Sequence, residues 1–247
     1  MKRLVLGSAI SLTSYADAAQ DVVRWARAGE SRYLCAANVH MLMEAWDSSV
    51  FRNVVNNADM VTPDGMPLVW MLRAKGEKEQ ERVYGPTLML RVLEAAEKEN
   101  LSVGFYGGDA ETLEMLIKRM QAQHPRLNVG FSYSPPFRML NPAEDEQIVQ
   151  DIRQSNIRIL FVALGCPKQE EWMGAHRGRI SAVMLGVGAA FDFHAGTVKQ
   201  SPAWLQKMGL EWFYRLLQEP KRLWKRYLFH NPRFVFLALS ELMKKNA

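Results

Sequence analysis

Residues 157–187 read IRILFVALGCPKQEEWMGAHRGRISAVMLGV, and this stretch decides the fold class. It begins with an apolar run at 157–163 and ends with a second one at 182–187. Runs of this length are typical of strands that are buried on both faces of a sheet. Between them lies a polar segment at the start of a helix, so the stretch predicts two parallel strands joined by a helix.

The same alternation continues outside this stretch. Short strands are predicted at residues 32–37, 102–106 and 127–131. Amphipathic helices are predicted at residues 87–99, at 109–123 with Asp109 as N-cap, and from Asn141-Pro142 onward. Strands that alternate with helices predict an α/β fold, with a mostly parallel sheet covered on both faces.

Composition excludes several classes of protein. The chain has 247 residues, of which 48% are apolar, so it can bury a sizeable core and is neither disordered nor collagen-like. The two cysteines, Cys35 and Cys166, form no metal or disulfide framework and fit a reducing cytosol. Cys166 is either a nucleophile or a small buried residue. No run is long and apolar enough to predict a spanning helix.

The C-terminal segment differs in charge from the rest. Residues 204–247 hold nine Lys and Arg against three Glu, and nine of the chain's aromatic residues. We therefore predict a body at residues 1–201 and a basic helical appendage at 202–247. Prolines at 202, 220 and 232 predict three helical pieces, of which 204–218 is one. Lys221, Arg222, Lys225 and Arg226 predict a cationic stripe opposite apolar residues.

A basic aromatic segment of this kind suits an anionic membrane, nucleic acid or a phosphorylated substrate. It also suits a packed helical layer with a solvated basic face. Exposed apolar surface on this segment leaves self-association into a homo-oligomer open.

Polar or glycine-rich loops follow four of the predicted strands and the apolar strand end Met60-Val61. In parallel sheets, ligands bind beyond the carboxyl ends of the strands, so these loops predict one crevice. The loops begin at Ala37, Val61, Gly104, Ala163 and Gly186.

Asp64 lies between Pro63 and Gly65 in the second of these loops. Proline fixes the approach of the chain and glycine leaves the carboxylate uncrowded, which suits a general base at a loop tip. The alternative is a turn or helix N-cap aspartate.

The other loops predict contacts to phosphate or sugar. Gly107 and Gly108 allow backbone N–H groups to approach a ligand at a helix start, or form a plain tight turn. Lys168 either faces phosphate or is a solvated lysine, and Gln169 beside it offers an amide. Gly186-Val187-Gly188 matches a dinucleotide fingerprint weakly, because Phe191 takes the place of the third glycine.

Several signatures of metal or serine chemistry are missing. The sequence holds no H-E-x-x-H, C-x-x-C or G-x-S-x-G, which disfavours a zinc hydrolase or serine esterase. It holds no D-x-D either, the pattern with which many nucleotide-sugar enzymes hold a divalent ion. If the chain cleaves a diphosphate ester, cations such as Arg215, Arg222 and Arg226 must meet the leaving charge, unless they form a solvated or lipid-facing stripe.

These motifs, taken in order, resemble the WecG/TagA/CpsF family of bacterial glycosyltransferases. The resemblance runs from about Ala36 to Arg226. Its carriers are Asn38-Val39-His40, Thr62 to Pro67, Arg82 to Pro86, Gly104 to Gly108, Gly165 to Glu170, Gly186 to Gly188, Phe191-Asp192 with Gly196, and Gly209 to Trp212 with Arg215, Pro220 and Arg222.

The resemblance implies a Rossmann-like fold and a metal-independent, inverting transfer of a hexose-type sugar from a UDP-sugar. N-acetylmannosamine or its uronic acid is favoured as the sugar, with glucose as an alternative. The implied acceptor is a polyprenyl-diphosphate-linked saccharide at the inner face of the cell membrane. We therefore expect a peripherally associated cytoplasmic enzyme of cell-surface polysaccharide synthesis, with no cofactor, no metal ion and no nucleic acid partner.

The resemblance also implies roles for residues. Asp64 falls on the family's proposed base, and Asn38, Arg82 and Gln169 fall on its supporting polar residues. Arginines of the C-terminal appendage, proposed to close over the diphosphate, fall on Arg215, Arg222 and Lys225 or Arg226. Ala36 stands where some members carry Thr, which removes a hydroxyl contact. The full set of expected substrate-binding residues is Asn38, Arg82, Gly107, Gly108, Lys168, Gln169, Gly188, Asp192, Arg215, Arg222 and Arg226.

Two other classes compete with this interpretation. The α/β pattern and Gly186-Val187-Gly188 also suit a nucleotide-binding oxidoreductase, which would bind NAD(P) rather than UDP. The basic aromatic segment also suits a non-catalytic adaptor that binds membranes or nucleic acid.

Overall fold

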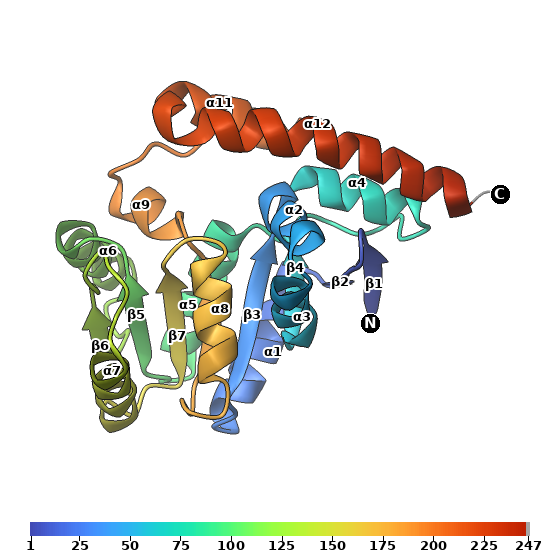
Figure 1. Cartoon of the computed structure of the whole chain (residues 1–247). Helices are drawn as coiled ribbons and strands as arrows, with labels where there is room; N and C mark the ends of the chain where they lie inside the picture. The colour runs from blue at the N-terminus through green and yellow to red at the C-terminus, as the bar shows by residue number, and fades with distance from the viewer. Residues whose placement is uncertain (246–247) are drawn as a thin grey trace. The chain divides into compact units, whose positions relative to one another are not determined.

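The computed structural model describes residues 1–245, and the chain forms two compact units (Figure 1). The first unit contains Met1–Ser14, Ala36–Tyr84 and Gln200–Ala247. The second contains Tyr15–Cys35 and Gly85–Lys199. The predicted division into a body at residues 1–201 and an appendage at 202–247 rests on charge and expected function, whereas these two units are defined by their compactness. The predicted division therefore stays a prediction.

A six-stranded parallel sheet forms the core of the fold, with strand order β4-β3-β8-β7-β5-β6. The strands are β3 (Arg32–Ala37), β4 (Met60–Pro63), β5 (Val103–Gly107), β6 (Val129–Tyr133), β7 (Ile159–Ala163) and β8 (Val183–Gly186). Strand β3 begins in the second unit and ends in the first, to which β4 belongs. The predicted parallel α/β fold and its five predicted strands are confirmed, with boundaries that differ by at most two residues.

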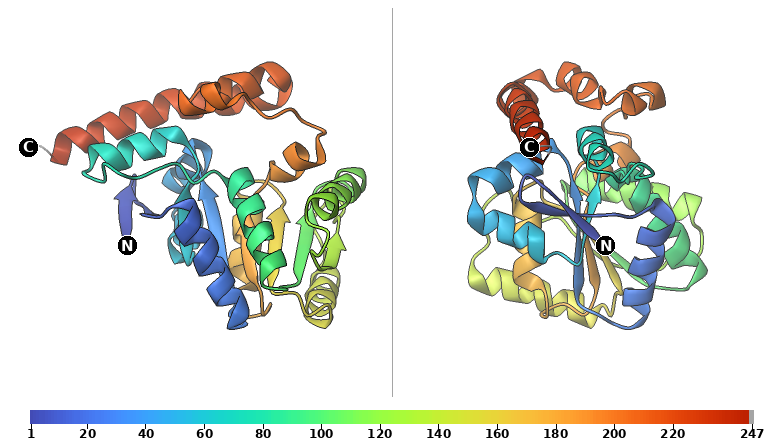
Figure 2. Two further views of the ribbon diagram at one scale, coloured as in Figure 1. Left: turned by 180° about the vertical axis from the view of Figure 1, so that it is seen from behind. Right: turned by 90° about the vertical axis from the view of Figure 1, so that its right-hand side faces the viewer.

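The apolar runs that predict the central strands are buried because both faces of the sheet are covered. Residues 159–162 of β7 and 183–185 of β8 are fully buried. The helices of the second unit are α1 (Tyr15–Arg27), α5 (Gly85–Lys98), α6 (Ala110–Gln123), α7 (Pro142–Gln154), α8 (Lys168–His176) and α9 (Ala190–Ala195). Figures 1 and 2 show α1, α5 and α6 on one face of the sheet and α7 and α8 on the other.

The predicted helix starts are confirmed at two caps. The Asp109 carboxylate accepts a hydrogen bond from the backbone N–H of Thr112 at 2.8 Å. Asn141 and Glu144 form a reciprocal capping box at the start of α7, with Pro142 in the first turn. Such caps satisfy backbone N–H groups that have no partner within the helix.

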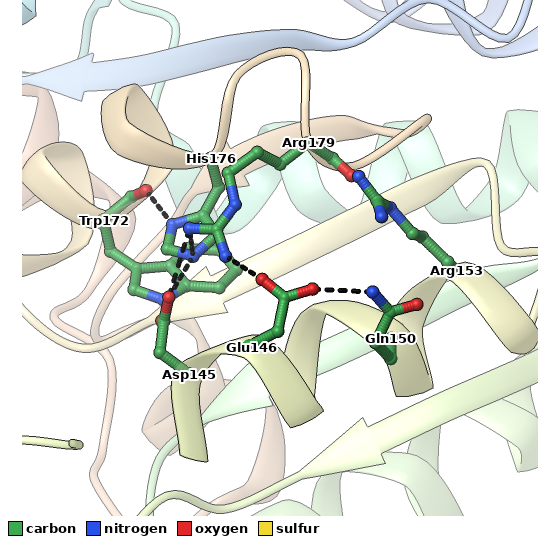
Figure 3. A network of polar contacts seen from close by, with 7 residues as sticks. All are labelled: Asp145, Glu146, Gln150, Arg153, Trp172, His176 and Arg179. Atoms are coloured by element: carbon green, nitrogen blue, oxygen red, sulfur yellow. Dashed lines mark hydrogen bonds and ion pairs between the residues drawn. The ribbon is translucent and has the colours of Figure 1, made fainter. Parts of the chain in front are cut away.

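A polar network joins α7 to the end of α8 (Figure 3). Asp145 on α7 contacts Nε2 of the buried His176 at 3.0 Å and Nη1 of Arg179 at 3.2 Å. Nδ1 of His176 contacts the carbonyl of Trp172 at 2.6 Å, and Arg179 donates to Glu146 at 2.8 Å. These bonds fix the C-terminal end of α8, the helix whose first residues are Lys168 and Gln169.

The first unit holds an antiparallel hairpin and six helices within residues 1–245. The strands are β1 (Lys2–Val5) and β2 (Ser8–Ser11), and the helices are α2 (Val39–Asp47), α3 (Ser49–Asn57), α4 (Met66–Ala74), α10 (Ala203–Lys207), α11 (Glu211–Gln218) and α12 (Pro220–Lys245). Leu6 and Gly7 both have positive φ, as a two-residue hairpin turn requires. The sequence analysis does not predict this hairpin.

The predicted helix break at Pro232 is wrong. Helix α12 runs without interruption from Pro220 to Lys245 with Pro232 inside it. Proline removes one backbone hydrogen bond, but α12 lies at the surface, where water can bind the carbonyl that loses its partner. Two ion pairs also hold the part of the helix that follows Pro232, since Arg233 pairs with Asp47, and Glu241 pairs with Lys75.

The predicted single helix at residues 204–218 is also wrong, because Gly209 separates α10 from α11. Gly209 has φ of +71°, a left-handed conformation that ends α10. A Cβ atom built on Gly209 would lie 2.6 Å from the ring of Trp70, so the backbone packs directly on that ring. Only glycine fits both conditions.

The predicted cationic stripe on α12 is only partly present. Lys221, Arg222 and Lys225 are exposed, but Arg226 is half-buried. The buried face of the helix is instead formed by Leu223, Phe234 and Ala238. Among residues 1–245, no helix has both the length and the apolar character that crossing a bilayer requires.

Candidate active site

A cavity of about 820 Å³ lies within the first unit. Its walls come from the loops after β3 and β4 and from α4, α11 and α12. It brings together five of the six expected site residues of this unit, namely Asn38, Asp64, Arg82, Arg215 and Arg226. The sixth, Arg222, does not line it.

The loop that carries Asp64 is anchored to the end of β3. The backbone N–H groups of Asp64 and Gly65 both donate to the carbonyl of Ala37, at 2.8 and 3.2 Å. Asn38, the next residue after Ala37, caps α2 by accepting from the N–H of Met41 at 3.2 Å. These bonds hold Asn38 and Asp64 side by side at the ends of two strands, as the sequence predicts.

Arg82 braces the Asp64 loop from the other side. Its Nε donates to the backbone carbonyl of Asp64, and its Nη2 donates to Glu211 at 2.6 Å. The hydroxyl of Tyr84 donates to the other oxygen of Glu211 at 2.7 Å, and the Arg82 guanidinium lies 4.0 Å from the centre of the Tyr84 ring. The β4 loop and α11 are thereby joined through one buried charged cluster.

The charges of this cluster stabilise one another. Burial disfavours the charge of Arg82, but the carboxylates of Asp64 and Glu211 outweigh burial and raise the Arg82 pKa. Burial, with the charges of Glu211 and Asp64, also raises the pKa of Tyr84, which therefore stays a hydrogen-bond donor. Arg82 remains cationic and Tyr84 neutral at physiological pH.

The three expected arginines of the C-terminal segment differ in their surroundings. Arg215 and Arg222 share Glu219, with Nη2–Oε2 distances of 3.7 and 2.7 Å. The side chain of Arg215 is 15% exposed and that of Arg222 is 58% exposed. Arg226 lies in the cavity wall beside Tyr227. Arg215 and Arg226 are thus the two that a ligand in the cavity can reach.

Most of the cavity wall beyond these charges is apolar. Three tryptophans contribute to it, from α4, α11 and α12, together with methionines, leucines and a valine. The main apolar lining residues are Met66, Trp70, Met71, Met208, Leu210, Trp212, Leu216, Trp224, Leu228, Val235, Leu239 and Leu242. The cavity therefore suits an amphiphile, with a charged group at one part and an apolar chain at the other.

The other six expected residues belong to the second unit, at the carboxyl ends of β5, β7 and β8. Gly107, Gly108 and Gly188 all have positive φ. A Cβ atom on Gly107 would lie 2.4 Å from the carbonyl oxygen of Ala163, so glycine is required there for space as well as for conformation. The strand register brings Gly107 beside Ala163 and Gly186 beside Val162.

Gln169 packs into this group of glycines. A Cβ atom on Gly186 would lie 3.1 Å from its Nε2, and one on Gly188 would lie 3.4 Å from its Oε1. Its Nε2 donates to the buried carboxyl of Glu170 at 2.7 Å. Burial raises the pKa of Glu170 to about 7. The two glycines therefore leave the room that the Gln169 amide occupies.

The remaining two residues lie at helix starts in the same unit. Lys168 is exposed in the first turn of α8, and Asp192 lies in the first turn of α9. The backbone carbonyl of Asp192 accepts from Gly196 and Thr197, which fixes the end of α9. A helix start is compatible with a solvated side chain and with one that faces a ligand. The substrate-binding roles of Lys168 and Asp192 therefore stay predictions.

Sequence reasoning assigns no role to Glu211 or Tyr84, although both fall within the quoted motifs. Glu211 is one of only three acidic residues in the basic segment 204–247, and this is the one sequence feature that distinguishes it as a candidate site residue. Its partner Arg82 lies 129 positions earlier in the chain, so the pairing cannot be read from local spacing.

Comparisons with known proteins agree with the motifs. The sequence model described as "Glycosyl transferase WecG/TagA/CpsF family" matches residues 3–247. An N-acetylglucosaminyldiphosphoundecaprenol N-acetyl-beta-D-mannosaminyltransferase of Bacillus spizizenii is 32% identical over 84% of this chain and 79% of its own length. The protein of the same name from Bacillus subtilis is 30% identical over 78% of this chain and 73% of its own length.

Proposed function

Because the chain belongs to the glycosyl transferase WecG/TagA/CpsF family, we propose that it transfers a hexose-type sugar from a UDP-sugar to a polyprenyl-diphosphate-linked saccharide. N-acetylmannosamine or its uronic acid is the favoured sugar, and the names of the two Bacillus relatives support N-acetylmannosamine and an undecaprenol-linked acceptor. Glucose is the alternative donor sugar. The transfer inverts the anomeric configuration and uses no metal ion.

One observation carries this proposal: the Asp64 loop lies at the rim of a cavity that is cationic in one part and apolar in another. A polyprenyl-diphosphate has the same division, with an anionic diphosphate and a branched apolar chain. Arg215 and Arg226 suit a diphosphate, and we assign them to the diphosphate of the leaving UDP, because guanidinium groups bind phosphate oxygens in a fork. The tryptophan and leucine side chains of α4, α11 and α12 suit the start of the isoprenoid chain.

Asp64 acts as the general base in this proposal. Its carboxylate accepts the proton of the acceptor hydroxyl, and that oxygen attacks the anomeric carbon from the side opposite the UDP group. The new glycosidic bond forms as the bond between the anomeric carbon and the diphosphate oxygen breaks. A positioned base of this kind contributes roughly 10²–10⁴-fold to the rate.

The donor contacts are assigned to the second unit. Gly107, Gly108 and Gly188 lie at the ends of β5 and β8, where phosphates and sugars bind in parallel sheets. Gly107 is buried, and the N–H groups of Gly108 and Gly188 donate to the carbonyls of Ala163 and Val162. The Gln169 amide, held by Glu170, supplies a fixed polar contact, and Lys168 and Asp192 lie at neighbouring helix starts. The negative charge that grows on the leaving UDP is stabilised by arginines and backbone N–H groups, with Arg222 as the exposed member of the set.

The C-terminal segment, residues 202–247, supplies the membrane contact in this proposal. Lys221, Arg222 and Lys225 are exposed on α12, and Phe229 and Phe236 on the same helix are 68% and 73% exposed. Cations beside exposed aromatic rings suit the headgroup region of an anionic bilayer. The proposed location is the inner face of the cell membrane, where the lipid-linked acceptor is reached.

A donor screen tests the proposal. Purified protein is mixed with a polyprenyl-diphosphate-N-acetylglucosamine acceptor and, in turn, UDP-N-acetylmannosamine, its uronic acid, UDP-glucose or UDP-N-acetylglucosamine, in the presence of EDTA. We expect mass spectrometry to show the acceptor heavier by one sugar with one of the first three donors. No product with any donor, even after Zn²⁺ is restored, or product that requires Mg²⁺ or Mn²⁺ and is not restored by Zn²⁺, would contradict the proposal.

A further inference from the structure

Three side chains with metal-binding atoms meet between α2 and α12 in the first unit. His40 and Glu44 are four residues apart on α2 and therefore lie on the same face of the helix. His230 projects from α12, which packs on α2. One nitrogen or oxygen atom from each of the three side chains lies within 4.8 Å of the others.

The distances within this group exceed hydrogen-bond length. Nδ1 of His40 lies 3.6 Å from Oε1 of Glu44, and Nε2 of His230 lies 3.8 Å from the same oxygen. A tetrahedral zinc ion with ligand bonds of about 2.0–2.2 Å holds its ligand atoms about 3.3–3.6 Å apart. The two separations from the Glu44 oxygen, 3.6 and 3.8 Å, are close to the edges of such a coordination shell.

Hydrogen bonding does not account for the position of His230. Its Nδ1 is buried and accepts or donates no hydrogen bond within the part of the chain that the structure describes. Its ring packs edge-on against the ring of His40, with centroids 5.1 Å apart. The two imidazoles and the carboxylate therefore offer a donor set in which Nδ1 of His230 has no hydrogen-bond partner among the described residues.

We propose that His40, Glu44 and His230 bind one divalent transition-metal ion, with zinc as the best match. Two imidazole nitrogens and one carboxylate oxygen are ligands that zinc prefers. The three side chains are only 14%, 34% and 18% exposed, in the order His40, Glu44 and His230. His40 and His230 line the cavity, so the fourth coordination position opens toward it and takes a water molecule.

The bound ion would cross-link α2 to α12 and so fix the wall of the cavity. This inference goes beyond the proposed transfer, in which Asp64 and arginines act without an ion. The site is therefore structural, and its occupancy is measured without any substrate.

A second histidine–glutamate contact in the chain provides the matched control. Nδ1 of His124 lies 3.3 Å from Oε2 of Glu97, within hydrogen-bond distance. This pair is part-buried like the proposed site but includes no second histidine. It should bind no ion with comparable affinity.

The test is a Co²⁺ titration of the full chain after dialysis against EDTA, followed by the visible absorption of tetrahedral Co²⁺ and by displacement with Zn²⁺. We expect one equivalent to bind, with His230→Gln and Glu44→Gln each weakening affinity about 100-fold or more. His124→Gln should bind like the wild type. Circular dichroism checks that each variant is folded.

A second measurement follows α12 itself. Zn²⁺ should slow tryptic cleavage within residues 220–245 in the wild type and in His124→Gln, but not in His230→Gln or Glu44→Gln. The proposal is overturned if the wild type shows no saturable one-to-one binding. It is equally overturned if the site variants bind the ion as tightly as the control variant does.

Discussion

At the scale of single residues, one buried arginine organises the candidate site. Arg82 contacts the backbone of Asp64, the carboxylate of Glu211 and the ring of Tyr84 at once. The resemblance to the family implies a supporting polar role for Arg82, and the geometry agrees with a brace that holds the loop of the proposed base. A ligand contact by Arg82 stays a prediction.

Replacing Glu211 with Gln tests this brace. The variant leaves the Arg82 charge buried without its carboxylate, so we expect the free energy of unfolding to fall by about 1–3 kcal/mol. Urea denaturation measures it. Glu144→Gln is the control, because Glu144 pairs with the exposed Arg138 at the surface and its replacement should cost clearly less stability than Glu211→Gln. Equal effects of the two variants would show that the brace adds no stability.

Glu170 gives the protein a stability that depends on pH. Burial raises its pKa from 4.5 to about 7, so the folded state binds a proton more tightly than the unfolded state does. The free energy of unfolding should therefore fall as pH rises from about 4.5 to 7, by roughly 3 kcal/mol at most. Glu170→Gln removes this titration.

The measurement is the melting temperature of the wild type and of Glu170→Gln between pH 5 and 8. We expect the melting temperature of Glu170→Gln to rise relative to that of the wild type as pH increases through this window. A difference between the two proteins that stays constant across the window would rule out titration of Glu170 there.

At the scale of elements, local sequence rules fail to predict two helix boundaries in the C-terminal segment. Pro220 begins α12, as its sequence predicts, but Pro232 lies within the same helix and Gly209 divides the preceding one. Tertiary contacts decide both cases. Asp47 and Lys75 hold the part of α12 that follows Pro232, through Arg233 and Glu241, and the Trp70 ring occupies the space that a side chain at position 209 would need.

Gly209→Ala tests the break between α10 and α11. Alanine there must adopt a left-handed backbone and also displace the Trp70 ring. Gly76→Ala is a matched control, because Gly76 has φ of +107° but no atom within 4 Å of its Cβ position. Both variants should lose about 1–2 kcal/mol from strain, and Gly209→Ala about 1–3 kcal/mol more. Equal losses in thermal unfolding would mean that the packing on Trp70 is loose.

At the scale of the whole molecule, the strands were the most predictable feature and long-range pairs the least. The runs at 157–163 and 182–187 are apolar apart from Arg158, which is typical of strands covered on both faces. Asn38 and Asp64 follow neighbouring strands, and they line one cavity together with three of the four arginines expected in the first unit. The Arg82–Glu211 pair and the short β1–β2 hairpin carry no periodic signal and were missed.

The proposed membrane contact belongs to this scale too. Phe229 and Phe236 are exposed on α12 outside the cavity, so replacing both with Ser should leave the site intact. We expect binding to anionic vesicles to weaken at least about tenfold, because two aromatic side chains no longer enter the headgroup region. Vesicle cosedimentation measures it, with Phe137→Ser as the control, since Phe137 is 95% exposed in the second unit. Unchanged binding would remove α12 from the membrane contact.

The role of Asp64 is the central claim, and turnover of Asp64→Asn and Asp64→Ala tests it most directly. Asp151→Asn, on the exposed face of α7, is the control. With donor and lipid-linked acceptor saturating, we expect kcat to fall about 10²–10⁴-fold in both Asp64 variants while UDP-sugar affinity stays within a few-fold of wild type. An Asp64 variant that turns over at the rate of the Asp151→Asn control would contradict it.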